Sequence, residues 1–277
     1  MASMALPPYD DNMLKLMCKT FKTANGHPHV TIPGKTLLIT GSNTGIGLAC
    51  ANMLPTLGLS HLIMAVRSVD KGEAAAAPIR KAHPNCTVEV WPLDMLSYSS
   101  IQAFTERCKT LPRLDMAILN AGIGSSTTSR INPSTGHEET IQVNYLSTTL
   151  LSILLVPVLA AHSTPSSPGR LTIVGSGSAL FASFENRNED PLLPSFDIPF
   201  AGLIAAGERY GTSKLLVLML VHELSLFVPA DKVIINTVEP GLTSGTSLHR
   251  DFSGPGKYMM AAMKKMSAKT PEQAAWT

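Results

Sequence analysis

The 277-residue sequence carries little charge, because Asp, Glu, Lys and Arg make up only 15% of it and the formal net charge is +2. A balance this weak gives no reason to expect nucleic acid or an anionic membrane surface as a partner. Cysteine is also scarce, and no two cysteines form a C-x-x-C pair or a metal-ligand spacing with histidine. We therefore expect no metal site, and free thiols in a reducing compartment, at Cys18, Cys50, Cys86 and Cys108.

A secretory signal and a transmembrane run are missing as well. Asp10, Asp11 and Lys15 interrupt any apolar core near the N-terminus, which also lacks a basic segment. The most membrane-like run, Tyr145 to Ala161, contains polar residues and a proline and is shorter than the roughly 20 apolar residues that span a bilayer. We expect a buried helix there and a cytoplasmic protein. The hydrophobic share of 44% suits a soluble chain with a sizeable core.

What the chain does have is a strand that runs into three glycines, in the sequence TLLITGSNTGIG from Thr36 to Gly47. Helical spacing follows, so the pattern predicts a strand, a tight turn and a helix N-terminus. Unpaired N–H groups and the positive end of the helix dipole favour an anion there, most simply a pyrophosphate. A plain glycine turn is the alternative, but the flanking strand and helix favour the phosphate site. The candidate cofactor contacts in this turn are Gly41, Ser42, Asn43, Gly45, Ile46 and Gly47.

The spacing T-G-x-x-x-G-x-G resembles the glycine motif of the short-chain dehydrogenase/reductase family. Membership implies an α/β fold with a doubly wound parallel sheet, Rossmann-like, and helices on both faces. It also implies hydride transfer between a nicotinamide and a carbonyl or alcohol carbon. The motifs described below follow in the family's order, so the resemblance covers roughly Thr31 to Ser247.

Beyond the glycine turn, strands and helices alternate, as in a parallel sheet covered on both faces. The six expected strands are Thr36–Thr40, Leu62–Val66, Val88–Leu93, Met116–Leu119, Leu171–Val174 and Val233–Val238. The expected helices are Ala49–Leu57, Val69–Ala82, Tyr98–Lys109, Glu138–Ala161 and Tyr210–Phe227. Residues 1–31 form an extension with a short amphipathic helix between Met13 and Phe21, and residues 32–277 form a single catalytic domain.

Cofactor choice depends on the residue about 20 positions past the glycines, which is an acid in NAD sites and an arginine in many NADP sites. Counting from Gly47 reaches Arg67, just past the second strand, where no carboxylate stands. This position predicts NADP(H), with a solvated surface arginine as the alternative. Three further stretches resemble cofactor motifs of the family, each after a strand: Asp94-Met95, Asn120-Ala121-Gly122, and Pro240-Gly241 with Thr243.

The strongest local signal is Tyr210-Gly211-Thr212-Ser213-Lys214, in which Tyr210 and Lys214 share one face of a helix. A free tyrosine titrates near 10. A cation about 4 Å away at an effective dielectric of about 20 contributes roughly 4 kcal/mol, so Lys214 is expected to lower the phenol pKa by up to about three units. By resemblance, Tyr210 exchanges the proton and Lys214 also binds the nicotinamide ribose. A chance Y-x-x-x-K pair is the alternative.

Two more residues complete the expected catalytic set by resemblance. Ser176 follows the fifth strand and resembles the serine that holds the substrate oxygen, with Ser178 as the alternative if the register differs by two. Asn144 resembles the helix asparagine that frees a backbone carbonyl for a proton-relay water. Taken alone, it would be a polar spot on a buried helix.

The spacing of 34 residues between Ser176 and Tyr210 exceeds that of many family members. The insert, about residues 184–208, resembles those of the retinol-dehydrogenase-like and protochlorophyllide-reductase-like branches. It is rich in apolar residues, so it is either a flap over a hydrophobic substrate or a loop packed on its own surface. Residues 242–270 are expected to form a substrate-side loop and helix, with Met259, Met260, Met263 and Met266 lining an adaptable wall or filling core.

We therefore predict an NADP(H)-dependent oxidoreductase acting on a ketone or secondary alcohol of a bulky hydrophobic substrate, in specialised or lipid metabolism. The alternatives are an isomerase, cyclase or dehydratase on the same fold, or a non-catalytic NADP-binding module. Analogy with the family also predicts a homodimer through the helices at residues 138–161 and 210–227.

Overall fold

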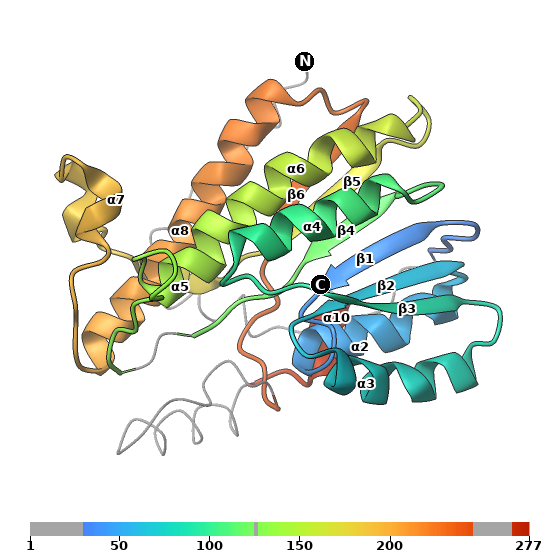
Figure 1. The fold of residues 1–277 in the computed structure, drawn as a ribbon, viewed down its shortest axis with the longest axis horizontal. Helices are drawn as coiled ribbons and strands as arrows, with labels where there is room; N and C mark the ends of the chain where they lie inside the picture. The colour runs from blue at the N-terminus through green and yellow to red at the C-terminus, as the bar shows by residue number, and fades with distance from the viewer. Residues whose placement is uncertain (1–29, 125–126, 246–267, 277) are drawn as a thin grey trace.

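The computed structural model describes residues 30–124, 127–245 and 268–276 (Figure 1). Its centre is one six-stranded parallel sheet in the order β3-β2-β1-β4-β5-β6. The strands are β1 (Thr36–Thr40), β2 (His61–Val66), β3 (Thr87–Pro92), β4 (Met116–Leu119), β5 (Gly169–Val174) and β6 (Val233–Val238). All six predicted strands are present, and the predicted doubly wound α/β fold is confirmed.

The order of the strands reverses between β1 and β4. The chain first builds outward from β1 to β3, then returns to place β4, β5 and β6 on the other side of β1. Ligands of such sheets bind in the crevice outside the carboxyl ends of the strands, at this switch point. The turns that follow β1 and β4 meet there, and they carry the glycine turn and the Asn120-Ala121-Gly122 stretch.

Helices cover both faces of the sheet (Figure 1). One face carries α2 (Gly45–Met53), the short η1 (Leu54–Leu57), α3 (Val69–Ala82) and α10 (Pro271–Ala275), and the other carries α4 (Tyr98–Lys109), α6 (Thr148–Ala161) and α8 (Leu203–Phe227). Alternate residues of a strand point to opposite faces. Thus Leu37 and Ile39 of β1 lie in the core beneath α2 and α3, while Leu38 lies in the core beneath α4 and α6.

The helix predicted at residues 138–161 is interrupted. Helix α5 (Glu139–Ile141) leads into η2 (Gln142–Ser147), a π-helical turn, before α6 begins. Thr148 Oγ1 donates to the Val143 carbonyl at 2.9 Å, and Ser147 Oγ donates to the Met95 carbonyl. Among the described residues, Glu139–Ala161 alone is long and apolar enough to cross a membrane, and half of its most apolar window is buried. Its apolar residues pack against α4, β5 and β6 and form part of the core.

Helix α8 begins at Leu203, seven residues before the predicted start at Tyr210. The residues Leu203 to Arg209 include good helix formers, and Gly202 at φ +96 marks the start of the helix. The last part of the insert at residues 184–208 is therefore helical. Its first part contains η4 (Glu185–Asn188) and α7 (Leu192–Ser195), which lie outside the body of the sheet and its helices (Figure 1).

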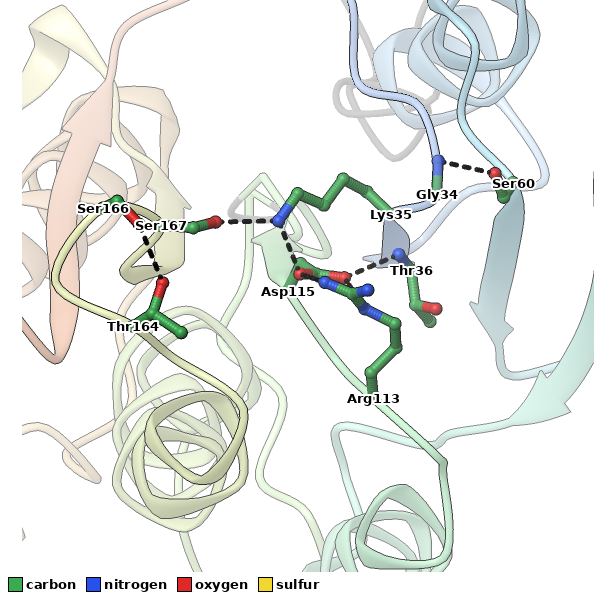
Figure 2. A network of polar contacts seen from close by, with 9 residues as sticks. All are labelled: Gly34, Lys35, Thr36, Ser60, Arg113, Asp115, Thr164, Ser166 and Ser167. Carbon is green, nitrogen blue, oxygen red and sulfur yellow. Dashed lines mark hydrogen bonds and ion pairs between the residues drawn. The ribbon is translucent and has the colours of Figure 1, made fainter.

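Asp115, which precedes β4, forms a network of polar contacts at the amino ends of the strands, at the end of the sheet opposite the ligand site (Figure 2). Its carboxylate accepts hydrogen bonds from Lys35 Nζ and from the Thr36 N–H, both at 2.9 Å, and from the Arg113 guanidinium. Lys35 Nζ also donates to Ser167 Oγ at 2.8 Å. Burial alone would raise the Asp115 pKa, but these bonds outweigh it and the pKa is lowered. The network joins the amino ends of β1 and β4, away from the ligand edge.

Two expectations lie outside the described residues. These are the amphipathic helix between Met13 and Phe21 and the methionines of the 242–270 segment, which is described only up to residue 245 and from 268.

Cys50, Cys86 and Cys108 are free and buried. After Thr270, which forms a capping box with Gln273, α10 packs against α2.

Candidate active site

The glycine turn after β1 has the shape of an anion cradle. Gly41 at φ +66 and Gly45 at φ +57 take left-handed conformations that favour glycine. The N-cap residue of α2, Thr44, makes no side-chain capping bond, so no N-cap side chain accepts from the first N–H groups of the helix. The Ser42 hydroxyl is buried and has no hydrogen-bond partner among the described residues. These donors fit an anionic ligand such as a pyrophosphate.

Close packing fixes the position of this turn. A Cβ on Gly47 would lie 2.5 Å from the Gly41 carbonyl oxygen and 2.6 Å from Asn120 Nδ2. Asn120 Nδ2 donates to the Thr40 carbonyl at 2.9 Å, and the Ala121 N–H donates to Thr40 Oγ1 at 2.9 Å. The turns after β1 and β4 are therefore bonded to each other, as their predicted common role requires.

The other candidate cofactor residues stand at the same edge of the sheet. Arg67 directly follows β2, is exposed, and makes no hydrogen bond or ion pair within the described part of the chain. Asp94 follows β3 and accepts from the Leu96 N–H at 3.0 Å, with Met95 buried beside it. Asn43 and Ile46 lie partly exposed in the glycine turn.

The turn after β6 holds the last cofactor candidates. Pro240 is buried and Gly241 has φ +78. Thr243 is also buried, and its hydroxyl donates to the Gly241 carbonyl at 3.1 Å. The hydroxyl of Thr243 is thus already engaged within its own turn.

Ser176 and Tyr210 meet at the end of β5. The Gly175 N–H donates to the Val238 carbonyl at 2.8 Å, which holds the turn after β5 beside the end of β6. The Ser176 side chain stabilises the ionised Tyr210 phenol and so lowers its pKa. Ser178 Oγ donates to Ser176 Oγ at 2.9 Å. Of the two candidate serines, Ser176 is the one that influences the pKa of the phenol.

Lys214 is buried one helical turn from Tyr210. Its Nζ donates to the Val174 carbonyl at 2.8 Å and lies 6.0 Å from the centroid of the Tyr210 ring. Burial lowers the pKa of Lys214 to about 8. Burial also raises the pKa of Tyr210 to about 12; the Ser176 hydrogen bond opposes this rise, and the charge of Glu239 adds to it. The predicted lowering of the phenol pKa by Lys214 is therefore wrong for the cofactor-free protein, because desolvation outweighs a cation that is bonded elsewhere.

Asn144 is fixed within the π-helical turn. Its Nδ2 donates to the Ile123 carbonyl at 2.9 Å and to Ser213 Oγ at 3.0 Å, and its Oδ1 accepts from the Ile123 N–H at 2.9 Å. A Cβ on Gly122 would lie 3.2 Å from Asn144 Oδ1 and 3.6 Å from Lys214 Nζ. The structure thus brings Asn144, Lys214 and the turn after β4 together in one place.

Comparison with known proteins decides the family. The family model for short chain dehydrogenases matches residues 35–187, more than half of the chain. The short chain dehydrogenase/reductase mfmJ of Annulohypoxylon moriforme is 46% identical over 251 residues, which cover 90% of this chain and 72% of the relative. The chain belongs to the short-chain dehydrogenase/reductase family. The short chain dehydrogenase opdN of Penicillium oxalicum is also similar, at 43% identity over 90% of this chain and 83% of the relative.

Solved structures share this short-chain dehydrogenase/reductase fold. The RhlG/NADP active-site complex of Pseudomonas aeruginosa has a TM-score of 0.65 and 21% identity, covering 90% of this chain and 89% of that chain. A short-chain dehydrogenase from Sphingobium yanoikuyae in complex with NADPH has a TM-score of 0.63 and 21% identity, covering 87% of this chain and 81% of that chain. At these identities the likeness establishes the fold.

Two residues of this short-chain dehydrogenase/reductase site escape the sequence prediction. Ser213 accepts from Asn144, and it lies inside the Tyr210–Lys214 stretch that the sequence does single out. The charge of Glu239 raises the pKa of the phenol, and its carboxylate lies against Gly177, where an added Cβ would lie 2.9 Å from Glu239 Oε1. The sequence feature that could have identified Glu239 is its position at the carboxyl end of β6, directly before Pro240.

The insert packs on a different face of α8. Phe196 is buried against Ile141 and Leu216, and a cavity of about 630 Å³ between the insert and α8 is lined in part by Glu208 and Thr212. Residues two apart on a helix point about 200° from each other, so these two side chains face away from Tyr210. The described contacts of the insert therefore lie on a face of α8 other than the one that carries Tyr210.

Proposed function

We propose that this chain is an NADP(H)-dependent oxidoreductase that transfers a hydride between the nicotinamide and a ketone or secondary alcohol. The observation that carries the proposal is the meeting of Ser176, Tyr210 and Lys214 at the strand edge that also bears the glycine turn. A serine that acts on a tyrosine hydroxyl, beside a buried lysine, suits proton exchange with a substrate oxygen.

The glycine turn and the neighbouring strand ends would hold the cofactor. The uncapped start of α2 and the unpartnered Ser42 hydroxyl suit the pyrophosphate, and exposed Arg67 after β2 suits a 2′-phosphate. Two similar structures were solved with NADP or NADPH bound, which supports NADP(H) as the cofactor of this chain. The remaining proposed contacts are Gly41, Asn43, Gly45, Ile46, Gly47, Asp94, Met95, Asn120, Ala121, Gly122, Tyr210, Lys214, Pro240, Gly241 and Thr243.

When bound, NADPH supplies the hydride. Ser176 holds the carbonyl oxygen of the substrate against Tyr210. With a pKa raised to about 12, the phenol is protonated at neutral pH and donates its proton to that oxygen. A protonated phenol is the acid that a reduction of the carbonyl needs. Asn144 keeps the π-helical turn and the loop after β4 in position, and Lys214 binds the nicotinamide ribose and completes the proton path.

The substrate in this proposal is bulky and apolar, and the reaction belongs to specialised or lipid metabolism. Support comes from the short helix η3 (Gly177–Phe181), which begins directly after Ser176 and packs against α8. Its Leu180 and Phe181 are 47% and 44% exposed. Apolar side chains left exposed so close to Ser176 suit a hydrophobic substrate surface.

We place the protein in the cytoplasm as a homodimer, with residues 32–277 acting as one catalytic domain. Ile153 on α6 and Met219, Leu226 and Phe227 on α8 are at least half exposed, which supports an interface along these helices. Light scattering should give twice the mass of one chain. A monomer at working concentration would remove this part of the proposal.

The function is tested by following the nicotinamide absorbance of NADPH with a panel of ketones. We expect NADPH to be consumed with at least one bulky ketone, and Tyr210→Phe to abolish turnover while it keeps cofactor binding. Conversion of a substrate without any change in NADPH absorbance would favour an isomerase, cyclase or dehydratase. Full activity of the Tyr210→Phe variant would refute the proton-transfer role.

A further inference from the structure

Glu239 places a carboxylate at the reacting end of the site. It follows β6 and precedes buried Pro240, in the turn that the Gly175–Val238 hydrogen bond holds beside the turn after β5. A Cβ on Gly177 would lie 2.9 Å from Glu239 Oε1 and 3.3 Å from its carboxyl carbon. The carboxylate therefore rests against Gly177, the residue next to Ser176, and any larger residue at Gly177 would displace it.

The Glu239 carboxylate acts electrostatically on the Tyr210 phenol. Within the part of the chain that the structure describes, the charged groups recorded against Tyr210 are Lys214 from α8 and Glu239 from the turn after β6. Lys214 Nζ is bonded to the Val174 carbonyl, and no ion pair joins it to Glu239 among the described residues. The negative charge of Glu239 acts on Tyr210 and raises the pKa of the phenol.

Glu239 is also unpaired among the residues that the structure describes. Within the described ranges it makes no hydrogen bond and no ion pair, although it is partly buried. Glu138, by contrast, accepts from the Ile141 N–H, and Glu208 accepts from the N–H groups of Ser183 and Phe184. A carboxylate offers about four acceptor positions, and the described residues fill none of those of Glu239. A ligand that brings a hydrogen-bond donor would fill them.

We propose that Glu239 is a substrate-binding residue that accepts a hydrogen bond from a hydroxyl or ammonium group close to the reacting carbonyl. This inference rests on the proposed function. It deepens that proposal by assigning a substrate class: ketones that carry a donor on a carbon near the carbonyl, on an otherwise apolar body. Ser176 would hold the carbonyl oxygen of the substrate. Glu239, which lies against Gly177, would accept the hydrogen bond from the hydroxyl or ammonium group on the carbon near that carbonyl.

The test compares acetophenone with its α-hydroxy and α-amino derivatives in the wild-type chain and in Glu239→Gln. We expect the wild type to prefer one of the two donor-bearing ketones by about tenfold or more in kcat/KM, and the variant to lose most of that preference. The favoured derivative identifies the donor as hydroxyl or ammonium. The control is Glu223→Gln, an exposed carboxylate on α8 far along the helix from Tyr210, which should keep the preference. An equal preference in the wild type and in Glu239→Gln would overturn the proposal.

A second measurement needs neither cofactor nor turnover. Tyrosinate absorbance of the wild type, with the Tyr210→Phe curve subtracted, follows the ionisation of Tyr210 over the pH range in which circular dichroism shows a folded chain. Removing the negative charge in Glu239→Gln should move this ionisation to lower pH, whereas a merely structural residue would not. Coincident curves would overturn the placement of Glu239. Failure of all three ketones to react would count against the proposed function, and the titration would still decide the placement.

Discussion

Replacing Gly47 with alanine should damage both folding and cofactor binding. The added Cβ would lie 2.5 Å from the Gly41 carbonyl oxygen and 2.6 Å from Asn120 Nδ2, closer than real Cβ contacts come. The first neighbour is backbone, and the second is a side chain that is bonded to the Thr40 carbonyl, so neither can move freely. Overpacking of this kind costs about 1–3 kcal/mol of the free energy of unfolding.

The matched control is Gly207→Ala on α8. Nothing lies within 4 Å of a Cβ at Gly207, and the residue is helical without a positive φ. The same substitution should therefore raise the free energy of unfolding by about 0.5–1 kcal/mol, because alanine is the better helix former. Urea denaturation measures both changes, and NADPH fluorescence measures binding, which should weaken about tenfold or more in Gly47→Ala. A Gly47→Ala variant as stable as the wild type, with unchanged NADPH affinity, would refute the close packing of the turn.

Three further changes test other parts of the structure. Asp115→Asn should lower the free energy of unfolding by about 1–3 kcal/mol. The folded pKa of Asp115 lies below its unfolded value of 3.8. The stability difference between wild type and variant in urea melts should therefore persist at neutral pH and shrink as the pH falls below 3.8. Lys214 has a folded pKa of about 8 and an unfolded value of 10.5, so the stability of the wild type relative to Lys214→Met should rise with pH between these values, and a flat difference would contradict the buried ammonium. Arg67→Asp should weaken NADPH binding more than NADH binding in fluorescence titrations, and equal losses would remove the 2′-phosphate argument.

Local patterns were enough to predict most of the framework. The structure gives α3 and α4 the predicted bounds Val69–Ala82 and Tyr98–Lys109, because their amphipathic spacing and Ser97 cap are properties of neighbouring residues. Strand β5 begins at Gly169, two residues before its predicted start, since Gly169 gains its partner only across the sheet at Val233. Boundaries of this kind depend on tertiary pairing.

The candidate site shows where sequence reasoning ends. Motif order brought Ser176, Tyr210 and Lys214 to one edge of the sheet, because parallel strands share that edge. The pKa of Tyr210 could not be predicted in the same way. It depends on how deeply the phenol is buried and on which acceptor Lys214 finds, and neither is visible in a four-residue spacing. Glu239 could not be predicted for a related reason. It comes close to Gly177 only because β5 and β6 pair in the folded sheet.

The most direct test of the central claim is isotope transfer. NADPH labelled with deuterium at the transferable C4 position is incubated with the wild type and a ketone that it reduces, and the alcohol is analysed by mass spectrometry. We predict one deuterium on the carbinol carbon in the wild-type product and no alcohol with Tyr210→Phe. An alcohol that carries no deuterium, or labelled alcohol formed at the wild-type rate without the Tyr210 hydroxyl, would contradict hydride transfer assisted by this residue.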